Sequence, residues 1–200
     1  SCRVSNVYIR GGMDPLFAHD DLRSIVEELR RHGVRKIVGD VVLDATMKDT
    51  ATLGRGWCWD DKARPLTPLL YRRGNKLSDN LLRALSQAGI TVGGFVRTGV
   101  APTAAPVWLA RTHTIDQVLR PMMKESDNLC AESMFFQMAA LSRRPYANYR
   151  DAVAQMSKLI ARWNVSPDEY QIVDGSGLSL YNYLTPELLV LSLRYAYRNG

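Results

Sequence analysis

The chain has 200 residues, of which 46% are hydrophobic and 23% charged, with a formal net charge of +6. This balance is typical of a globular protein of one domain or two small ones, and no stretch approaches the roughly 20 apolar residues of a membrane helix. The positive charges are scattered, at most paired as in Arg30-Arg31, which disfavours a nucleic-acid binder and leaves an anionic polymer as a natural partner.

The first half alternates helical and strand patterns. Apolar residues with helical spacing follow two early aspartates, and a glycine closes each helical stretch before a β-rich run. The predicted elements are a helix over 20–32 ending at Gly33, a strand over 34–43 stopped by Asp44, an ordered loop over 54–70, a helix over 77–88, and a strand over 90–96 after Gly89.

The second half is predicted to be mainly helical, with helices over 113–125, 129–141, 148–163 and 185–200. Pro121 lies inside the first of these and should kink or restart it. Leu129, Phe135, Met138 and Leu141 should face inward from the second. Residues expected inward from the third are Tyr149, Val153, Met156, Leu159, Ile160 and Trp163.

Cys2, Cys58 and Cys130 are the three cysteines. The odd count and the absence of a Cys-x-x-Cys pair indicate neither a zinc site nor a disulfide framework. Cys58 and Cys130 have apolar or aromatic neighbours, so both are expected to be small buried hydrophobic residues.

A Ser-Asp-Asn triplet at 126–128 lies between two predicted helices. All three residue types cap helices well, so spacing alone favours a helix-start turn. The same triplet recurs at 78–80 before another helix, where a cap is again favoured. One corner of a serine-hydrolase active site is the alternative that the residues alone leave open.

The segment DGSGLSLYNYLTP, residues 174–186, is the second candidate. Gly175 and Gly177 flank Ser176 and permit positive φ angles and the close approach of another group. Position 174 is Asp, so the segment is not a Gly-x-Ser-x-Gly elbow, and it fits no dinucleotide or phosphate loop. By itself it is a surface turn before a helix capped at Thr185.

Four segments gain meaning from their order: IRGGMDPLF (9–17), GVRKIVGDVVLD (33–44), MKESDNLCAE (123–132) and VDGSGLSLYNYLTPELL (173–189). Together they resemble the class C low-molecular-mass penicillin-binding proteins, serine D-alanyl-D-alanine carboxypeptidases/endopeptidases of the bacterial cell wall. The resemblance extends over about 9–193, and its most specific parts are the Ser-x-Asn segment and the Asp-Gly-Ser-Gly-Leu-Ser loop.

The resemblance implies an α/β fold, a fragment of the penicillin-binding/β-lactamase-like transpeptidase fold. Residues 1–110 would form an α/β inserted or connecting region. Residues 111–200 would form the helical part of the transpeptidase-like domain that carries the Ser-x-Asn motif. The segment between Trp57 and Leu85 looks short beside family members with an additional inserted domain there.

Family catalysis uses a Ser-x-x-Lys nucleophile, the Ser-x-Asn and a Lys-Thr-Gly on a strand edge. The 200 residues contain neither the first nor the third motif. Arg97-Thr98-Gly99 imitates the third but precedes the Ser-x-Asn, whereas the family motif follows the Asp-Gly-Ser-Gly loop. The chain is therefore interpreted as a central fragment that is inactive alone, because a serine needs an adjacent base.

The resemblance implies a role for each matching residue. Ser126 would relay a proton to the leaving amine, Asn128 would hold the substrate amide, and Asp127 would support the turn. The wall of the substrate-binding cleft would be Asp174, Gly175, Ser176, Gly177, Leu178 and Ser179. Leu180 stands where the family often has Arg, which weakens a claim of charge recognition at this loop.

The implied partners are peptidoglycan stem peptides ending in D-Ala-D-Ala, and β-lactams; the chemistry needs no metal or cofactor. The family implies a periplasmic or cell-envelope location, although the N-terminus shows no signal-peptide pattern. A degenerate homologue that binds wall peptides or a protein partner without turnover is the rival interpretation. A basic nucleic-acid-binding module is a weaker third one.

Overall fold

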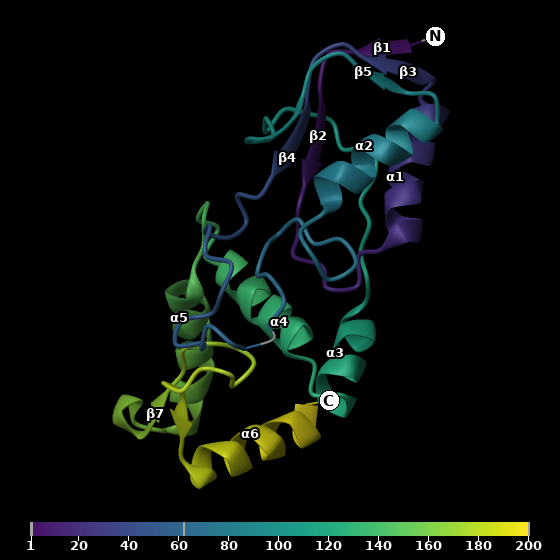
Figure 1. Ribbon diagram of the computed structural model, residues 1–200. Helices are drawn as coiled ribbons and strands as arrows, with labels where there is room; N and C mark the ends of the chain where they lie inside the picture. The colour runs from purple at the N-terminus through teal and green to yellow at the C-terminus, as the bar shows by residue number, and fades with distance from the viewer. Residues whose placement is uncertain (1, 62, 200) are drawn as a thin grey trace.

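The computed structural model describes residues 2–61 and 63–199, and the first part of this chain forms parallel sheets (Figure 1). Six short strands pair in two three-stranded sheets, in the orders β1-β3-β5 and β2-β4-β6. The predicted α/β class is confirmed. The strands are β1 (Cys2–Val4), β2 (Val7–Arg10), β3 (Val34–Ile37), β4 (Val41–Asp44), β5 (Thr91–Val92) and β6 (Val96–Thr98).

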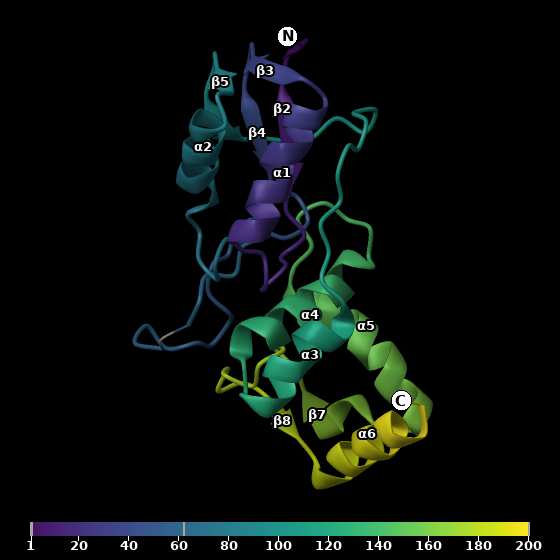
Figure 2. The same cartoon turned by 90° about the vertical axis from the view of Figure 1, so that its right-hand side faces the viewer.

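Two helices, α1 (His19–Arg31) and α2 (Leu77–Gln87), cover the same side of these strands, as Figures 1 and 2 show. Leucines spaced along both helices are buried in one core with Val34, Ile37 and Val41 from the sheets. Gly33 and Gly89 follow the helices with φ of 73° and 72°, the left-handed conformation that glycine adopts without steric penalty. Both predicted helix–glycine–strand passages are therefore present.

The strand predictions need correction, because the expected runs 34–43 and 90–96 are each broken into two strands. Each of the three successive strand pairs, β1 and β2, β3 and β4, and β5 and β6, is separated by a short break, at residues 5–6, 38–40 and 93–95. There the Asn6 side chain accepts from the Asp40 amide at 2.7 Å, and the Asp40 side chain accepts from the Phe95 amide at 2.9 Å. The second of these strands, β4, ends at Asp44 as expected, and Asp44 itself is its last, buried residue.

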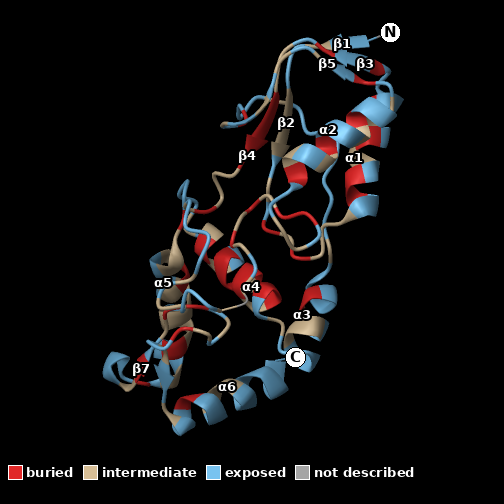
Figure 3. Cartoon of the chain, in the orientation of Figure 1, coloured by how far each residue is buried: buried red, intermediate tan, exposed pale blue. Residues whose placement is uncertain are grey.

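The second part consists of helices around one central helix. Figure 3 shows that α4 is mostly buried, whereas α6 is mostly exposed. The Thr185 hydroxyl accepts from the Leu188 amide at 3.3 Å, which is the predicted cap. The elements are α3 (Ile115–Lys124), α4 (Asn128–Ala140), α5 (Tyr149–Ile160), 3₁₀ turns at Ala161–Trp163 and Pro167–Glu169, antiparallel strands β7 (Tyr170–Gln171) and β8 (Tyr183–Leu184), and α6 (Pro186–Asn199).

Three expectations were wrong: the restart of a helix at Pro121 and the burial of Leu141 and Cys58. Helix α3 continues through Pro121 to Lys124, so Pro121 does not restart the helix, and the expected kink stays a prediction. Leu141 is 68% exposed, since α4 ends one residue before it and the chain turns away. Cys58 is exposed in the loop between β4 and α2, whereas Cys130 is buried as expected.

The core of the helical part also contains residues from the first half of the chain. Met13, Leu66 and Leu70 are at most 2% exposed and belong to the same apolar cluster as Phe135 and Ala139. The chain therefore passes from the sheets to the helices before α1 and again between β4 and α2. The division at about residue 110 stays a prediction, but the helical core draws on residues before it.

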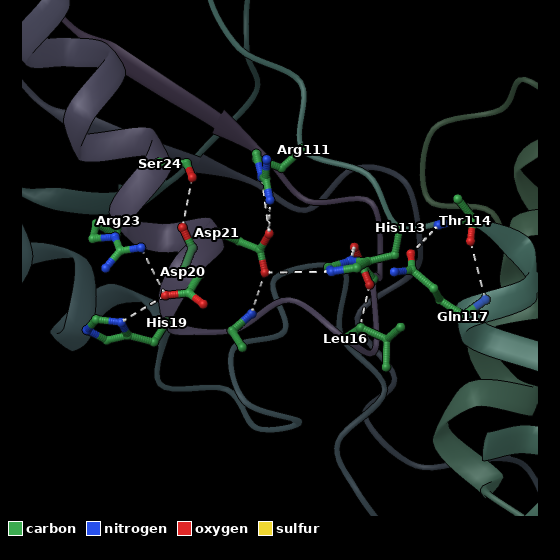
Figure 4. Close-up of polar contacts among 12 residues, drawn as sticks. Leu16, His19, Asp20, Asp21, Arg23, Ser24, Arg111, His113, Thr114 and Gln117 are labelled. Atoms are coloured by element: carbon green, nitrogen blue, oxygen red, sulfur yellow. Dashed lines mark hydrogen bonds and ion pairs between the residues drawn. The ribbon is translucent and has the colours of Figure 1, made fainter. Parts of the chain in front are cut away.

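Residues 99–114 form a connecting strap from β6 to α3 that is fastened to α1 (Figure 4). Trp108 stacks on His32 with ring centroids 4.1 Å apart. Arg111 Nη2 donates to Asp21 Oδ1 at 2.8 Å, and His113 Nδ1 lies 2.7 Å from Asp14 Oδ2. These contacts fix the start of α3 relative to α1, and hence the helical part relative to the sheets.

Candidate active site

The turn between α3 and α4 presents Ser126 at its tip. Ser126 is exposed and has φ of 56°, a left-handed conformation that costs a non-glycine residue about 1–2 kcal/mol. Neighbouring contacts must hold such a turn. The Asp127 amide donates to the Pro121 carbonyl at 3.4 Å, which closes the turn over the end of α3.

Asp127 anchors this turn. Its Oδ1 accepts from the Cys130 amide at 3.0 Å as the cap of α4, and Arg73 Nη2 donates to both carboxylate oxygens at 2.7 and 2.6 Å. Burial acts to raise the pKa of Asp127, but Arg73 and the Cys130 amide outweigh it, so the pKa is lowered. The expected supporting role of Asp127 thus has a geometric basis.

The loop 174–179 is organised around the carboxylate of Asp174, which is 4% exposed. Its Oδ1 accepts from the Gly177 amide at 2.9 Å and the Asn182 Nδ2 at 2.7 Å. Its Oδ2 accepts from Trp57 Nε1 at 2.8 Å and the Ser179 amide at 2.6 Å. Four donors therefore converge on one buried carboxylate and fix the path of the loop.

The two glycines of this loop serve different purposes. Gly177 has φ of 77°, the positive value expected from the sequence. A Cβ at Gly175 would lie 2.8 Å from the Ala131 carbonyl oxygen of α4, which is too close for any side chain. The loop therefore packs directly against α4, the helix that begins at Asn128.

A cavity of about 320 Å³ lies where the turn and the loop meet. Ser126, Asp127 and Asn128 line it from the turn, Leu178 from the loop, and Arg64 and Arg73 from the segment before α2. Ser126 and Asn128 are exposed there. Of the predicted site residues, the cavity brings together Ser126, Asn128 and Leu178.

The other predicted loop residues do not line the cavity. Asp174 and Ser179 are buried at 4% exposure, so they shape the loop from inside, whereas Ser176 is half-buried. The roles of all these residues toward substrate stay predictions.

The second triplet, Ser78 to Asn80, lies elsewhere and does not cap a helix. Helix α2 already begins at Leu77, its cap position is Lys76, and no side chain caps it. Asn80 Nδ2 donates to the Lys76 carbonyl at 2.7 Å, a contact within the first turn. The expected cap at 78 was therefore wrong, because the helix starts before the triplet.

Sequence reasoning missed Glu132, Arg73 and Trp57, whose partners lie far away in the chain. Glu132 is 1% exposed, and its Oε1 accepts from the amides of Gly175 at 3.0 Å and Ser176 at 2.8 Å. Burial, followed by the nearby Asp174 charge, raises the pKa of Glu132 against the opposing hydrogen bonds. The available signal was that Glu132 is the lone charged residue of α4.

A buried lysine was missed as well. Lys48 is 1% exposed, and its Nζ donates to Asp49 Oδ1 at 2.6 Å and to the Ala51 carbonyl. The same Nζ lies 4.6 Å from the centroid of the Phe136 ring. Lys48 therefore links the segment after β4 to α4 at Phe136.

Within residues 2–61 and 63–199, no helix is long and apolar enough to cross a membrane. The same residues contain no group of three or more His, Cys, Asp or Glu side chains arranged to hold a metal ion.

Comparison with known proteins assigns the family. The model of the D-Ala-D-Ala carboxypeptidase 3 (S13) family matches residues 3–69 and 73–200. The chain belongs to the S13 family. This confirms the resemblance found in the sequence, and the S13 match is interrupted inside the segment between Trp57 and Leu85 that looked short.

Among relatives, the D-alanyl-D-alanine carboxypeptidase DacB of Haemophilus influenzae is 20% identical over 278 aligned positions, covering 97% of this chain and 58% of DacB. The crystal structure of penicillin binding protein 4 (dacB) from that organism superposes with a TM-score of 0.88 at 19% identity, covering 98% of this chain and 62% of that one. Its complex with a β-lactam gives 0.75 at 20% identity, covering 97% and 59%. The chain thus shares the fold and spans about three fifths of these S13-like proteins.

Proposed function

We propose that these 200 residues are part of a serine D-Ala-D-Ala carboxypeptidase/endopeptidase that cleaves peptidoglycan stem peptides through an acyl-enzyme. The observation that carries the proposal is the cavity in which Ser126 and Asn128 meet Leu178 of the Asp-Gly-Ser-Gly loop. Those two segments are 48 residues apart in sequence, counted from Ser126 to Asp174. The family match over nearly the whole chain supports the same substrate class.

Two exposed side chains of the turn carry the proposed chemistry. The Ser126 hydroxyl can donate and accept a proton, so it relays a proton to the leaving amine as a general acid. The Asn128 amide offers a carbonyl acceptor and two N–H donors, which hold the substrate's peptide group. Asp127 and Arg73 keep both side chains on the same turn.

The attacking serine is proposed to come from residues outside this chain. No Ser-x-x-Lys and no Lys-Thr-Gly occurs in the 200 residues. Arg97 lies on β6, where its Nε binds Asp40 Oδ2 at 2.6 Å, and it is not among the residues that line the cavity. The 200 residues alone should therefore not bind a penicillin covalently.

The proposed partners are D-Ala-D-Ala stem peptides and β-lactams, in the periplasm or cell envelope. Solved relatives include a penicillin binding protein 4 complexed with a β-lactam. The sequence pI of about 9.4 suits an anionic wall polymer. Neither acyl transfer nor its hydrolysis at this site requires a metal or cofactor.

The rival function is that of a degenerate homologue that binds wall peptides or a protein partner without turnover. The complete open reading frame decides between the two. A Ser-x-x-Lys upstream supports the enzyme, and a full reading frame without it supports the binding protein.

The test of the site uses the full-length protein and two matched variants. Asn128→Ala should slow acylation by a fluorescent penicillin by a factor that corresponds to about 2–4 kcal/mol, because it removes a group aimed at the reacting region. Asn80→Ala is the control, since Asn80 has the same triplet but lies on α2 away from the cavity.

Both variants should melt close to the wild type, because each removes at most one surface contact. Equal acylation rates for Asn128→Ala and the wild type would contradict the assignment of Asn128. Slower acylation in Asn80→Ala would mean that the wrong triplet was chosen.

A further inference from the structure

Glu132 links α4, the helix that begins at Asn128, to the loop 174–179. It is 1% exposed on α4, and its Oε1 accepts from the Gly175 and Ser176 amides at 3.0 and 2.8 Å. Asn128, which lines the cavity, is the first residue of the same helix. Residues four apart lie on one face of a helix, about 6 Å apart along its axis. Helix α4 therefore carries both a cavity residue and the anchor of the opposite loop.

Packing alone does not account for a carboxylate at this position. A buried charge is unfavourable unless its hydrogen bonds compensate it, and an apolar side chain of similar size often packs as well or better. The neighbouring Ser133 hydroxyl is buried without a hydrogen-bond partner among the described residues. A buried polar side chain of α4 therefore does not always find a partner, whereas Glu132 has two. The two amides that Glu132 binds belong to the loop and to no other element.

The loop is thus held at two points. Asp174 fixes its internal shape through four donors, and Glu132 fixes its distance from α4. Leu178 belongs to this loop and lines the same cavity as Asn128. A shift of the 175–176 backbone away from α4 would therefore move Leu178 and change the width of the cavity.

We propose that Glu132 is the positioning residue that sets the loop 174–179 against Asn128, and so fixes the width of the pocket that receives the peptide or β-lactam. This inference rests on the proposed function for its catalytic consequence, but the tie between Glu132 and the loop is independent of it. Glu132 acts through the loop backbone and needs no contact with substrate.

The experiment compares three variants of Glu132 in the full-length protein. Glu132→Met fills the same space without an acceptor, Glu132→Gln keeps a carbonyl oxygen that can accept both amides, and Glu132→Asp keeps the charge but withdraws the acceptor by one methylene. Ser133→Ala is the matched control, because it changes a neighbouring buried side chain of α4 that makes no hydrogen bond within the described residues.

Two readouts are measured: amide hydrogen exchange at Gly175 and Ser176, and penicillin acylation separated into binding and acylation rate constants. In Glu132→Met, exchange at both amides should rise about two- to tenfold, the factor implied by losing an ordinary hydrogen bond. The acylation rate constant should fall by about 100-fold, as expected for a misplacement of about 1 Å. Glu132→Gln should stay near the wild type in both readouts, and so should Ser133→Ala.

Glu132→Asp should resemble Glu132→Met, and it gives the same information if the methionine variant does not fold. Wild-type exchange at Gly175 and Ser176 in both of these variants would overturn the proposal. Loss of both readouts in Glu132→Gln or in Ser133→Ala would also overturn it, because charge or packing would then be responsible. A wild type that penicillin does not acylate would defeat the proposed function, while the exchange readout would still test the role of Glu132.

Discussion

Replacing Asp174 by Asn should destabilise the candidate site out of proportion to the size of the change. Each carboxylate oxygen of Asp174 accepts from two donors, Gly177 and Asn182 on Oδ1, and Trp57 and Ser179 on Oδ2. An asparagine presents one oxygen and one NH2 group. Whichever way the amide turns, two of the four donors lose their acceptor and face another donor.

The magnitude follows from this count. A hydrogen bond to a charged acceptor contributes about 1.5–3 kcal/mol net, so losing two removes about 3–6 kcal/mol from the free energy of unfolding. For a domain of 150–250 residues, 1 kcal/mol corresponds to about 2–4 °C, and the melting temperature should fall by at least about 6 °C.

The assay is a thermal melt of the full-length protein followed by penicillin acylation at a temperature where both forms are folded. Asp168→Asn is the control, because Asp168 is exposed and should change stability by no more than about 0.5 kcal/mol. If Asp174→Asn melted within 1 °C of the control, as a rough margin of the measurement, the convergence of four donors would not hold the loop, and the reasoning would be refuted.

Three further measurements follow from the titratable groups. Cys58 is exposed and should react with a thiol reagent at pH 8, whereas burial raises the pKa of Cys130 to about 11 and should leave it unmodified in peptide mapping; the reverse pattern would contradict the fold. The pKa values of Asp21 and Asp127 are lowered in the folded state, so their stabilisation is complete above their ordinary value of about 3.9 and is lost as pH falls through the lowered values. Urea midpoints should therefore drop below about pH 4, and a flat profile to pH 2.5 would argue against both ion pairs. The raised pKa of Glu132 has the opposite sign, so its contribution to stability weakens as pH rises through the folded value. The melting temperature of Glu132→Gln minus that of the wild type should therefore increase with pH, and a difference independent of pH would contradict this.

Local patterns were sufficient for most helices and for the junctions that end them. The helical spacing of Leu22, Val26 and Leu29 places them in one core, and Gly33 ends α1 as predicted. These signals depend on neighbours within a few residues, so the sequence alone contains them. The sequence also allowed both candidate motifs to be recognised as those of one family, because each motif is a short run of consecutive residues.

Features set by contacts between distant residues were not predictable. Asp127 binds Arg73 across 54 residues and Asp174 binds Trp57 across 117, and no local pattern links these partners. The break in the strands has the same origin. A strand predicted as continuous is interrupted at 38–40, where the distant Asn6 side chain accepts from the Asp40 amide and leaves no room for a Cβ at Gly39.

The shared core of the two parts has a consequence for how the chain is made. Met13 is fully buried in a cluster with Phe135, and 135 − 13 = 122 residues separate them. At about 5–20 residues per second, ribosomes need roughly 6–24 s to synthesise the intervening chain. During that interval Met13, and later Leu66 and Leu70, cannot pack against the α4 residues of the cluster, even if the sheets and α1 have already formed. We therefore expect the nascent chain to present an apolar surface to chaperones until α4 has emerged, and a gene truncated before α4 to yield insoluble product.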